Sequence, residues 1–158
     1  MRVQVGIGQL EVVDVPAILI GTALGSCVGL IIFEDSTPIA GLAHIMLPSS
    51  EHGHLDDLPA KFADIAVPRM LSRLEGLGGD RQRCRAKLAG GARMFSGLNF
   101  IYADMGIRNI EAVKGKLSEY NIPVVTEDTG GEHARTIEFD TTTGMVLVRS
   151  LQFGERPI

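Results

Sequence analysis

The feature that most constrains this chain is a pair of short apolar runs separated by a polar break that ends in proline. The first run is 28–34, the break is 35–38 with the sequence Asp-Ser-Thr-Pro, and the second run is 39–47. Two apolar runs of this length around such a break predict a β-hairpin. The rest of the chain must therefore fold around an early pair of antiparallel strands.

The length of the turn decides which side chains share one face of this hairpin. If Glu34 pairs with Ile39, His44 lies opposite Gly29, and Cys27 lies two residues along on the same face. Cys27 and His44 are then diagonal neighbours with roughly 7–8 Å between their backbones, which side chains can span. A slip of one residue would place them on opposite faces, so this inference depends on the turn.

A thiol beside an imidazole is an arrangement with its own chemistry. The thiolate is a nucleophile, and a neighbouring histidine can take its proton and form an ion pair with it. Gly25 and Ser26 predict a tight turn whose backbone N–H groups are candidates for an oxyanion hole, and Thr22 is a candidate for orienting the imidazole. The competing interpretation is that Cys27 packs as a small hydrophobe, as most free cysteines do.

Length and composition are those of a single globular domain spanning residues 1–158. Hydrophobic residues make up 45% of the chain and charged residues 22%, and the net charge of −4 does not favour nucleic acid or an anionic membrane surface. No apolar segment approaches the ~20 residues that cross a bilayer, and no secretory leader is recognisable. Two cysteines make no disulfide framework. These features predict a cytoplasmic protein without membrane insertion.

One polar loop contains residue types that bind metals. It runs over 48–59 and includes His52, His54, Asp56 and Asp57. The four lie close together in one loop with no distant partner evident, which favours a solvated loop over a metal site. We therefore expect no metal and no cofactor.

The remaining elements indicate the class of fold. A helix is expected over 57–76, capped by Asp57 and kinked or divided at Pro68, and a second over 110–120, capped by Asn109. The glycine pair at 90–91 predicts a close backbone approach after a strand. A last hairpin is expected over 135–151, with a loose tail after 154. Roughly eight or nine strands and two or three helices favour an α/β (α+β) fold with layered mixed or antiparallel sheets and flanking helices.

Several sequence blocks occur in a characteristic order along nearly the whole chain. The first two are Gly25–Val28 and Ala43–Pro48, which are specific only in combination. The later blocks are Gly90–Phe95, Gly106–Asn109, Ile122–Val124, Glu127–Gly131 and Thr143–Val148. In this combination the chain resembles the CheD family of bacterial and archaeal chemotaxis proteins.

The resemblance implies a chemoreceptor glutamine deamidase that converts selected receptor glutamine side chains to glutamate and releases ammonia, with receptor methyl-ester hydrolysis as a second candidate activity. The family nucleophile falls on Cys27, its base on His44 and its third member on Thr22. The implied fold has nested β-sheets and flanking helices. The implied partners are methyl-accepting chemotaxis receptors and the phosphatase CheC, which would regulate the site and be stimulated in turn.

Two other functions compete with the deamidase. In the first, the chain acts mainly as a binding partner and activator of CheC, and the cysteine–histidine pair is idle. In the second, Cys27 is a redox thiol, for which Cys84 is the only other cysteine available as a partner. Rapid formation of a Cys27–Cys84 disulfide under mild oxidant would support the redox function.

Overall fold

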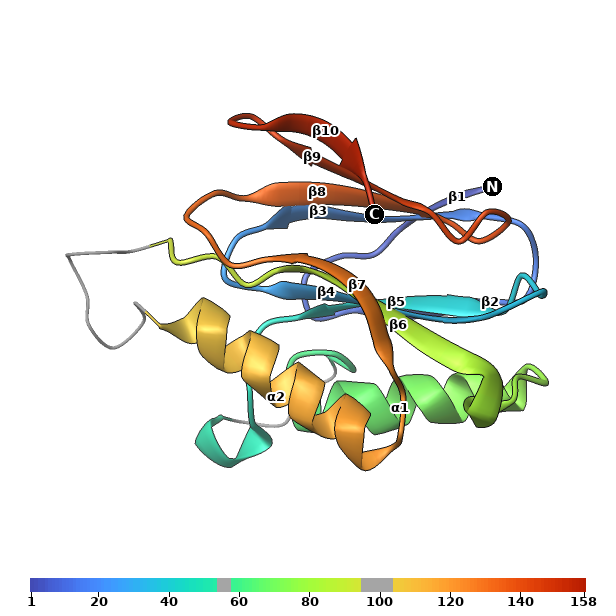
Figure 1. Ribbon diagram of the computed structural model, residues 1–158. Helices are drawn as coiled ribbons and strands as arrows, with labels where there is room; N and C mark the ends of the chain where they lie inside the picture. The colour runs from blue at the N-terminus through green and yellow to red at the C-terminus, as the bar shows by residue number, and fades with distance from the viewer. Residues whose placement is uncertain (54–57, 95–103) are drawn as a thin grey trace.

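In the part of the chain that the structure describes, two β-sheets are stacked and two α-helices lie against one of them, as Figure 1 shows. A computed structural model describes residues 1–53, 58–94 and 104–158. The outer sheet has the strand order β1-β3-β8-β9-β10, and the central sheet, which lies between the outer sheet and the helices, has the order β2-β5-β4-β6-β7. The α+β fold class expected from the sequence is confirmed.

The helices and strands follow one another in this order: β1 (Arg2–Gln4), β2 (Leu10–Val13), β3 (Ile18–Leu24), β4 (Val28–Glu34), β5 (Ala40–Ile45), a 3₁₀ turn (Ser50–His52), α1 (Ala63–Gly76), a 3₁₀ turn (Arg81–Arg83), β6 (Cys84–Gly90), α2 (Met105–Glu119), β7 (Val124–Thr129), β8 (Arg135–Asp140), β9 (Val146–Ser150) and β10 (Gly154–Pro157).

The central sheet is buried on both faces, and this explains the unbroken apolar sequence of its middle strands. All residues of β4 and β5 are buried. Alternate residues of β4, such as Leu30 and Ile32, pack against the helices, whereas Ile31 and Phe33 pack against the outer sheet. A strand with apolar layers on both sides gains from apolar residues at every position, so strict alternation of apolar and polar residues is lost.

The hairpin register predicted from the sequence is confirmed. The β4–β5 ladder pairs Gly29 with His44, and the N–H of Glu34 donates to the carbonyl of Ile39 at 3.0 Å, where the turn begins. Ser36 takes a left-handed conformation (φ 69°) within the turn. Each side chain of β5 therefore points to the face of the sheet that the sequence predicted.

The first helix starts later than expected. Phe62, the residue before α1, is extended (φ −115°, ψ 137°), and the Lys61 carbonyl accepts hydrogen bonds from two backbone N–H groups that follow β5. This segment is held against the end of the central sheet and cannot coil, so the helix begins at Ala63. The expected cap at Asp57 lies outside the described residues. Pro68 lies within the helix and does not divide it.

Two further expectations are wrong. Asn109 does not cap the second helix, because α2 begins at Met105 and Asn109 lies buried inside it. The tail after Gly154 is not loose, because β10 pairs with β9 along its length and the N–H of Ile158 donates to the carbonyl of Val146 at 2.8 Å. A strand of polar and charged residues can form there because pairing with β9 satisfies its backbone groups.

The glycine pair at the end of β6, Gly90 and Gly91, makes the close backbone approach that the sequence predicted. Gly90 has φ 103°, and a Cβ there would lie 2.3 Å from the carbonyl oxygen of Cys27. A Cβ on Gly91 (φ 67°) would lie 2.3 Å from Cδ1 of Ile110 in α2. The end of β6 is therefore pressed between the turn that carries Cys27 and the second helix.

We expect Gly90→Ala to destabilise the fold by about 2–4 kcal/mol, because the added Cβ overlaps a carbonyl and the backbone is left-handed. Gly115→Ala is the matched control, since a Cβ there meets nothing within 4 Å and α2 should gain roughly 0.5–1 kcal/mol. Urea unfolding monitored by circular dichroism measures both. Equal stability of the two variants would contradict the close approach.

Candidate active site

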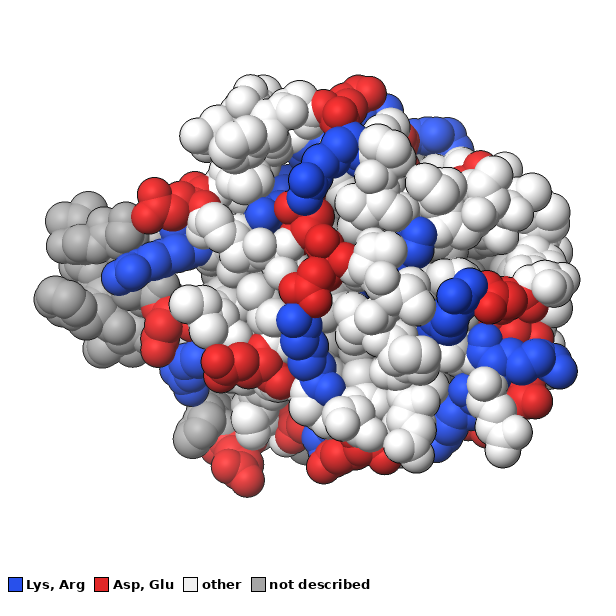
Figure 2. All heavy atoms as spheres, in the orientation of Figure 1, with Lys and Arg blue, Asp and Glu red and all other residues white. Residues whose placement is uncertain are grey.

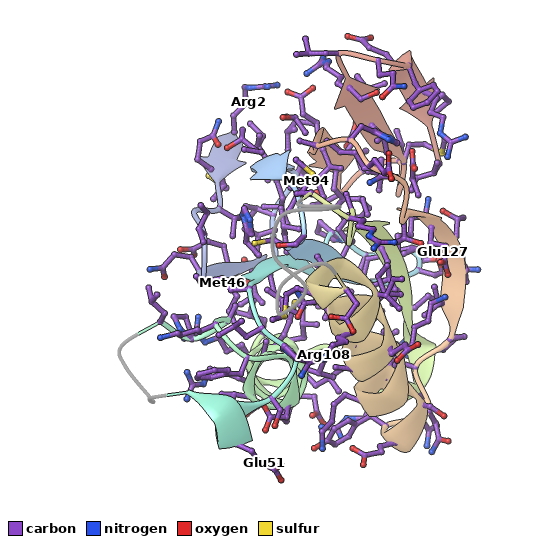
Figure 3. The ribbon with its side chains drawn as sticks, turned by 90° about the vertical axis from the view of Figure 1, so that its left-hand side faces the viewer. Arg2, Met46, Glu51, Met94, Arg108 and Glu127 are labelled. Carbon is purple, nitrogen blue, oxygen red and sulfur yellow. The ribbon has the colours of Figure 1, made fainter. Side chains whose placement is uncertain are left out.

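The candidate site lies at the end of the sheets where β3 turns into β4. The β7–β8 loop and the tip of the β9–β10 hairpin are at the same end, on the left in Figure 1. Figure 3 looks onto this end, with Met94 and Met46 labelled. Met94 packs on the turn, because a Cβ added to Gly25 would lie 3.1 Å from its Cγ.

The structure brings Cys27 and His44 to one face of the central sheet. Cys27 directly precedes β4, is partly exposed and packs against the apolar layer between the two sheets. His44 lies in β5 opposite Gly29 and is 1% exposed. Its neighbour two positions back along the strand, Leu42, belongs to the same layer, so strand alternation points His44 toward the outer sheet as well. The diagonal relation predicted from the register therefore holds.

Gly29 is needed between the two side chains because the layer above it is full. A Cβ on Gly29 would lie 2.8 Å from Cδ1 of Ile137 and 3.0 Å from Cδ1 of Leu24. These apolar groups come from the outer sheet and shield the layer from water on that side. The imidazole opposite Gly29 thus lies in a largely apolar setting.

Burial sets the protonation of both groups. Burial lowers the pKa of His44, and the nearby backbone of Val5 opposes this shift. The Val5 backbone does not reach hydrogen-bond geometry, and neither ring nitrogen has a hydrogen-bond partner within the described parts of the chain. Burial also raises the pKa of the Cys27 thiol, which its own backbone N–H opposes. Both directions favour uncharged forms at neutral pH. At rest both groups are therefore uncharged, and the Cys27 sulfur and the ring nitrogens of His44 are not hydrogen-bonded to each other.

The turn before Cys27 is held by three donors from outside it. Three consecutive carbonyl groups, those of Gly25, Ser26 and Cys27, each accept one hydrogen bond. The donors and distances are Ala92 N–H to Gly25 at 2.8 Å, Asn109 Nδ2 to Ser26 at 2.9 Å and Gly91 N–H to Cys27 at 2.8 Å. In the parts of the chain that the structure describes, the N–H groups of Ser26 and Cys27 donate to no other residue. They remain available to bind an oxyanion, as the sequence suggested.

Thr22 lies elsewhere at this end. A register shift in the β3–β8 ladder lies between Gly21 and Leu24, and Ala23 within it has φ 56°. Thr22 is exposed and lines a hollow of about 760 Å³ between the loop before β8 and the β9–β10 tip. The structure does not bring its hydroxyl into hydrogen-bond contact with His44, whose ring nitrogens have no described partner. The orienting role of Thr22 stays a prediction.

Asn109 is the site residue that the sequence reasoning missed. It is fully buried, and its Nδ2 donates to the carbonyls of both Ser26 and Met46 at 2.9 Å. A signal was present in the sequence, because Asn109 begins the stripe that continues at Val113 and Leu117 on one face of α2. An amide on an apolar stripe must find hydrogen-bond partners inside the protein.

The second cysteine lies at the far end of the same sheet. Cys84 starts β6 and pairs with Glu34, the last residue of β4, whereas Cys27 precedes the first residue of β4. Seven residues of extended strand separate the two positions, which is roughly 23 Å. A disulfide requires Cα atoms within about 7 Å, so these two thiols cannot pair in this fold.

Charge and metal ligands add little to the description of the site. On the face shown in Figure 2, basic and acidic side chains are interspersed, with neither sign covering it alone. The described residues hold no group of three or more His, Cys, Asp or Glu placed to bind a metal. His54, Asp56 and Asp57 lie outside the described residues, so the expectation of a solvated loop is untested.

The candidate cysteine-nucleophile site of this α+β protein consists of a half-buried thiol, a neutral imidazole on the next strand of the hairpin, and a turn with two amides that have no acceptor among the described residues. The family model for CheD, described as CheD chemotactic sensory transduction, matches residues 46–150. The alignments with curated relatives span 99% of the chain and so include positions 27 and 44, which lie before the matched range. It belongs to the CheD family.

Two of these relatives indicate the degree of similarity. The chemoreceptor glutamine deamidase CheD of Halalkalibacterium halodurans is 45% identical over 158 residues, with 98% of that protein covered. The probable chemoreceptor glutamine deamidase CheD of Clostridium novyi is 43% identical over 161 residues, again with 98% covered. Within the described residues, neither helix is long and apolar enough to cross a membrane.

We expect slow alkylation of Cys27 by iodoacetamide at pH 7 that rises about tenfold per pH unit to beyond pH 9, because the pKa of its thiol lies above the ordinary 9.0. Peptide mass spectrometry on the Cys84→Ala variant measures this without interference from the second thiol. A rate that has already reached its plateau at pH 7 would contradict the neutral resting pair.

Proposed function

We propose that this protein hydrolyses glutamine side chains of methyl-accepting chemoreceptors to glutamate, with Cys27 as nucleophile and His44 as base. The observation that carries the proposal is the Gly29–His44 pairing, which puts thiol and imidazole on one face at an end of the sheets. The names of the relatives, chemoreceptor glutamine deamidases at 43–45% identity, supply the substrate class.

The reaction begins from two uncharged groups. His44 takes the proton from the Cys27 sulfur as the thiolate attacks the carboxamide carbon of the substrate. The backbone amides of Ser26 and Cys27 bind the oxygen that becomes negative. Since the pKa of the buried imidazole is lowered, His44 returns its proton readily to the departing nitrogen, and ammonia leaves.

A thioester between Cys27 and the substrate remains after ammonia has left. Water, deprotonated by His44, attacks this thioester, and the sulfur departs and recovers its proton, which leaves glutamate on the receptor. A glutamyl methyl ester would give the same thioester with methanol as the leaving group. We therefore propose ester hydrolysis as a secondary activity of the same residues.

The partners follow from the family. We propose that a CheC-type phosphatase binds at this end of the molecule and controls access to Cys27, and that the protein works in the cytoplasm. An adaptor that only activates CheC is the alternative function. Mass spectrometry of receptor cytoplasmic fragments separates the two, because an adaptor would leave every glutamine unconverted while binding CheC tightly.

A redox function for Cys27 is disfavoured by two observations. Cys84, the first residue of β6, lies opposite the far end of β4 and is too distant to form a disulfide with Cys27. The raised pKa of the Cys27 thiol leaves little thiolate at neutral pH to react with oxidants. Both features are compatible with a nucleophile that is activated by its base during turnover.

We expect Cys27→Ala to abolish ammonia release from receptor fragments and His44→Gln to lower kcat by roughly 10²–10⁴-fold, the usual contribution of a general base. Cys84→Ala is the matched control and should keep its activity, because this thiol is distant from the site. Ammonia release and conversion of receptor glutamine are measured together. Full activity in the Cys27→Ala protein would rule out the mechanism.

Thr22 remains the proposed third member of the site, and one variant tests it. Thr22→Val removes the hydroxyl with little change in size. If the hydroxyl orients His44 when substrate is bound, kcat should fall by about tenfold while KM is maintained. Unchanged kcat would remove Thr22 from the proposed triad.

A further inference from the structure

Asn109 joins the two strands that carry the thiol and the imidazole, at the point where their ladder stops. The last pair of the β4–β5 ladder is Val28 with Ile45. Beyond this pair, Cys27 and then Ser26 lie before the start of β4, and Met46 lies after the end of β5. Asn109 reaches from α2 and donates from its Nδ2 to the carbonyls of Ser26 and Met46, both at 2.9 Å. It thereby extends the pairing of the strands beyond the ladder.

The amide group of Asn109 can have only one orientation here. Nδ2 carries two N–H groups, one for each carbonyl, whereas a flipped amide would turn Oδ1 toward two other oxygens. In the observed orientation Oδ1 is buried without a hydrogen-bond partner among the described residues. An apolar side chain such as leucine would avoid this buried, unpaired oxygen on a helix face otherwise occupied by Val113 and Leu117. The asparagine is therefore poorly explained by helix packing alone.

The bond to Ser26 has a direct effect on the candidate oxyanion hole. The carbonyl of Ser26 and the N–H of Cys27 belong to one peptide unit, which is planar and trans, so the two groups point in opposite directions. Asn109 holds the carbonyl toward the helix side of the central sheet. The N–H of Cys27 must then point to the other side, where the sulfur of Cys27 and the ring of His44 lie.

We propose that Asn109 is a positioning residue that aims the Cys27 N–H at the substrate oxyanion and fixes the separation of the two strands at the site. The proposal rests on the proposed hydrolysis. The donors to the flanking carbonyls of Gly25 and Cys27 are the backbone amides of Ala92 and Gly91, which depend on no side chain. The central peptide unit of the turn, by contrast, depends on one side chain.

The first test compares Asn109→Leu with Val113→Ala, a buried residue one turn further along α2 that has no polar contact with the turn. Asn109→Leu should lower kcat for receptor deamidation by about 10- to 1,000-fold with KM within about twofold, since loss of an aimed oxyanion donor acts on the transition state. Val113→Ala should lower stability and keep kcat. Urea unfolding measures the folded fraction of each. If leucine prevents folding, Asn109→Ala removes the amide without adding bulk and serves instead.

The second test needs no receptor. The Cys27 N–H opposes the effect of burial on its own thiol, so releasing the peptide unit should move the pH profile of Cys27 alkylation to higher pH in Asn109→Leu. Val113→Ala should keep the wild-type profile, because Val113 has no polar contact with the turn. A wild-type protein that releases no ammonia would end the proposed function while this profile still tests Asn109. A folded Asn109→Leu protein that matches Val113→Ala in kcat and in profile would overturn the positioning role.

Discussion

The pairing of Glu34 with Ile39 at one hairpin turn is the constraint on which the candidate site depends. Every later pair along β4 and β5 follows from it, including Gly29 with His44 at the other end of the ladder. Because side chains alternate between faces, a slip of one residue would send the imidazole to the helix side and keep the thiol away from it. Such a slip would also bury Gly29 and Gly41 against the wrong layers. The register is thus protected by the packing on both sides of the central sheet.

The same packing determines the chemistry available to the two groups. A sheet that is covered on both faces gives its side chains little water, and burial shifts the pKa of His44 downward and that of Cys27 upward. Near the end of the strands the apolar layers are followed by the turn at Gly25–Cys27, whose three carbonyls accept hydrogen bonds, whereas the amides of Ser26 and Cys27 have no acceptor among the described residues. In such an apolar setting, these two backbone N–H groups would stabilise a developing negative charge more strongly than they would in water.

The sequence was sufficient for features that depend on local pattern, and insufficient for those that depend on contacts between distant segments. The hairpin, its register and the close approach at the glycine pair 90–91 were predictable. Each depends on a few adjacent residues: the turn residues set the hairpin and its register, and glycine is the residue that permits a close backbone approach. The late start of α1 was not, since it follows from pairing of the Lys61 carbonyl with residues after β5. An asparagine near a helix start is typical of a cap, so the sequence favours that role for Asn109. Its actual hydrogen bonds, to the carbonyls of Ser26 and Met46, depend on segments that are distant in the sequence. Thr22 lines an exposed hollow because β3 forms a bulge where it pairs with β8. No local sequence pattern predicts this bulge.

The raised pKa of the Cys27 thiol also affects how fast this thiol reacts with oxidants. A thiol that is mostly protonated reacts slowly with peroxides and with electrophilic metabolites, which attack thiolates. In the mechanism that we propose, Cys27 stays protonated until His44 removes its proton in the complex with substrate. In the proposed mechanism, oxidants would therefore compete with substrate for Cys27 mainly during turnover, when its thiolate forms.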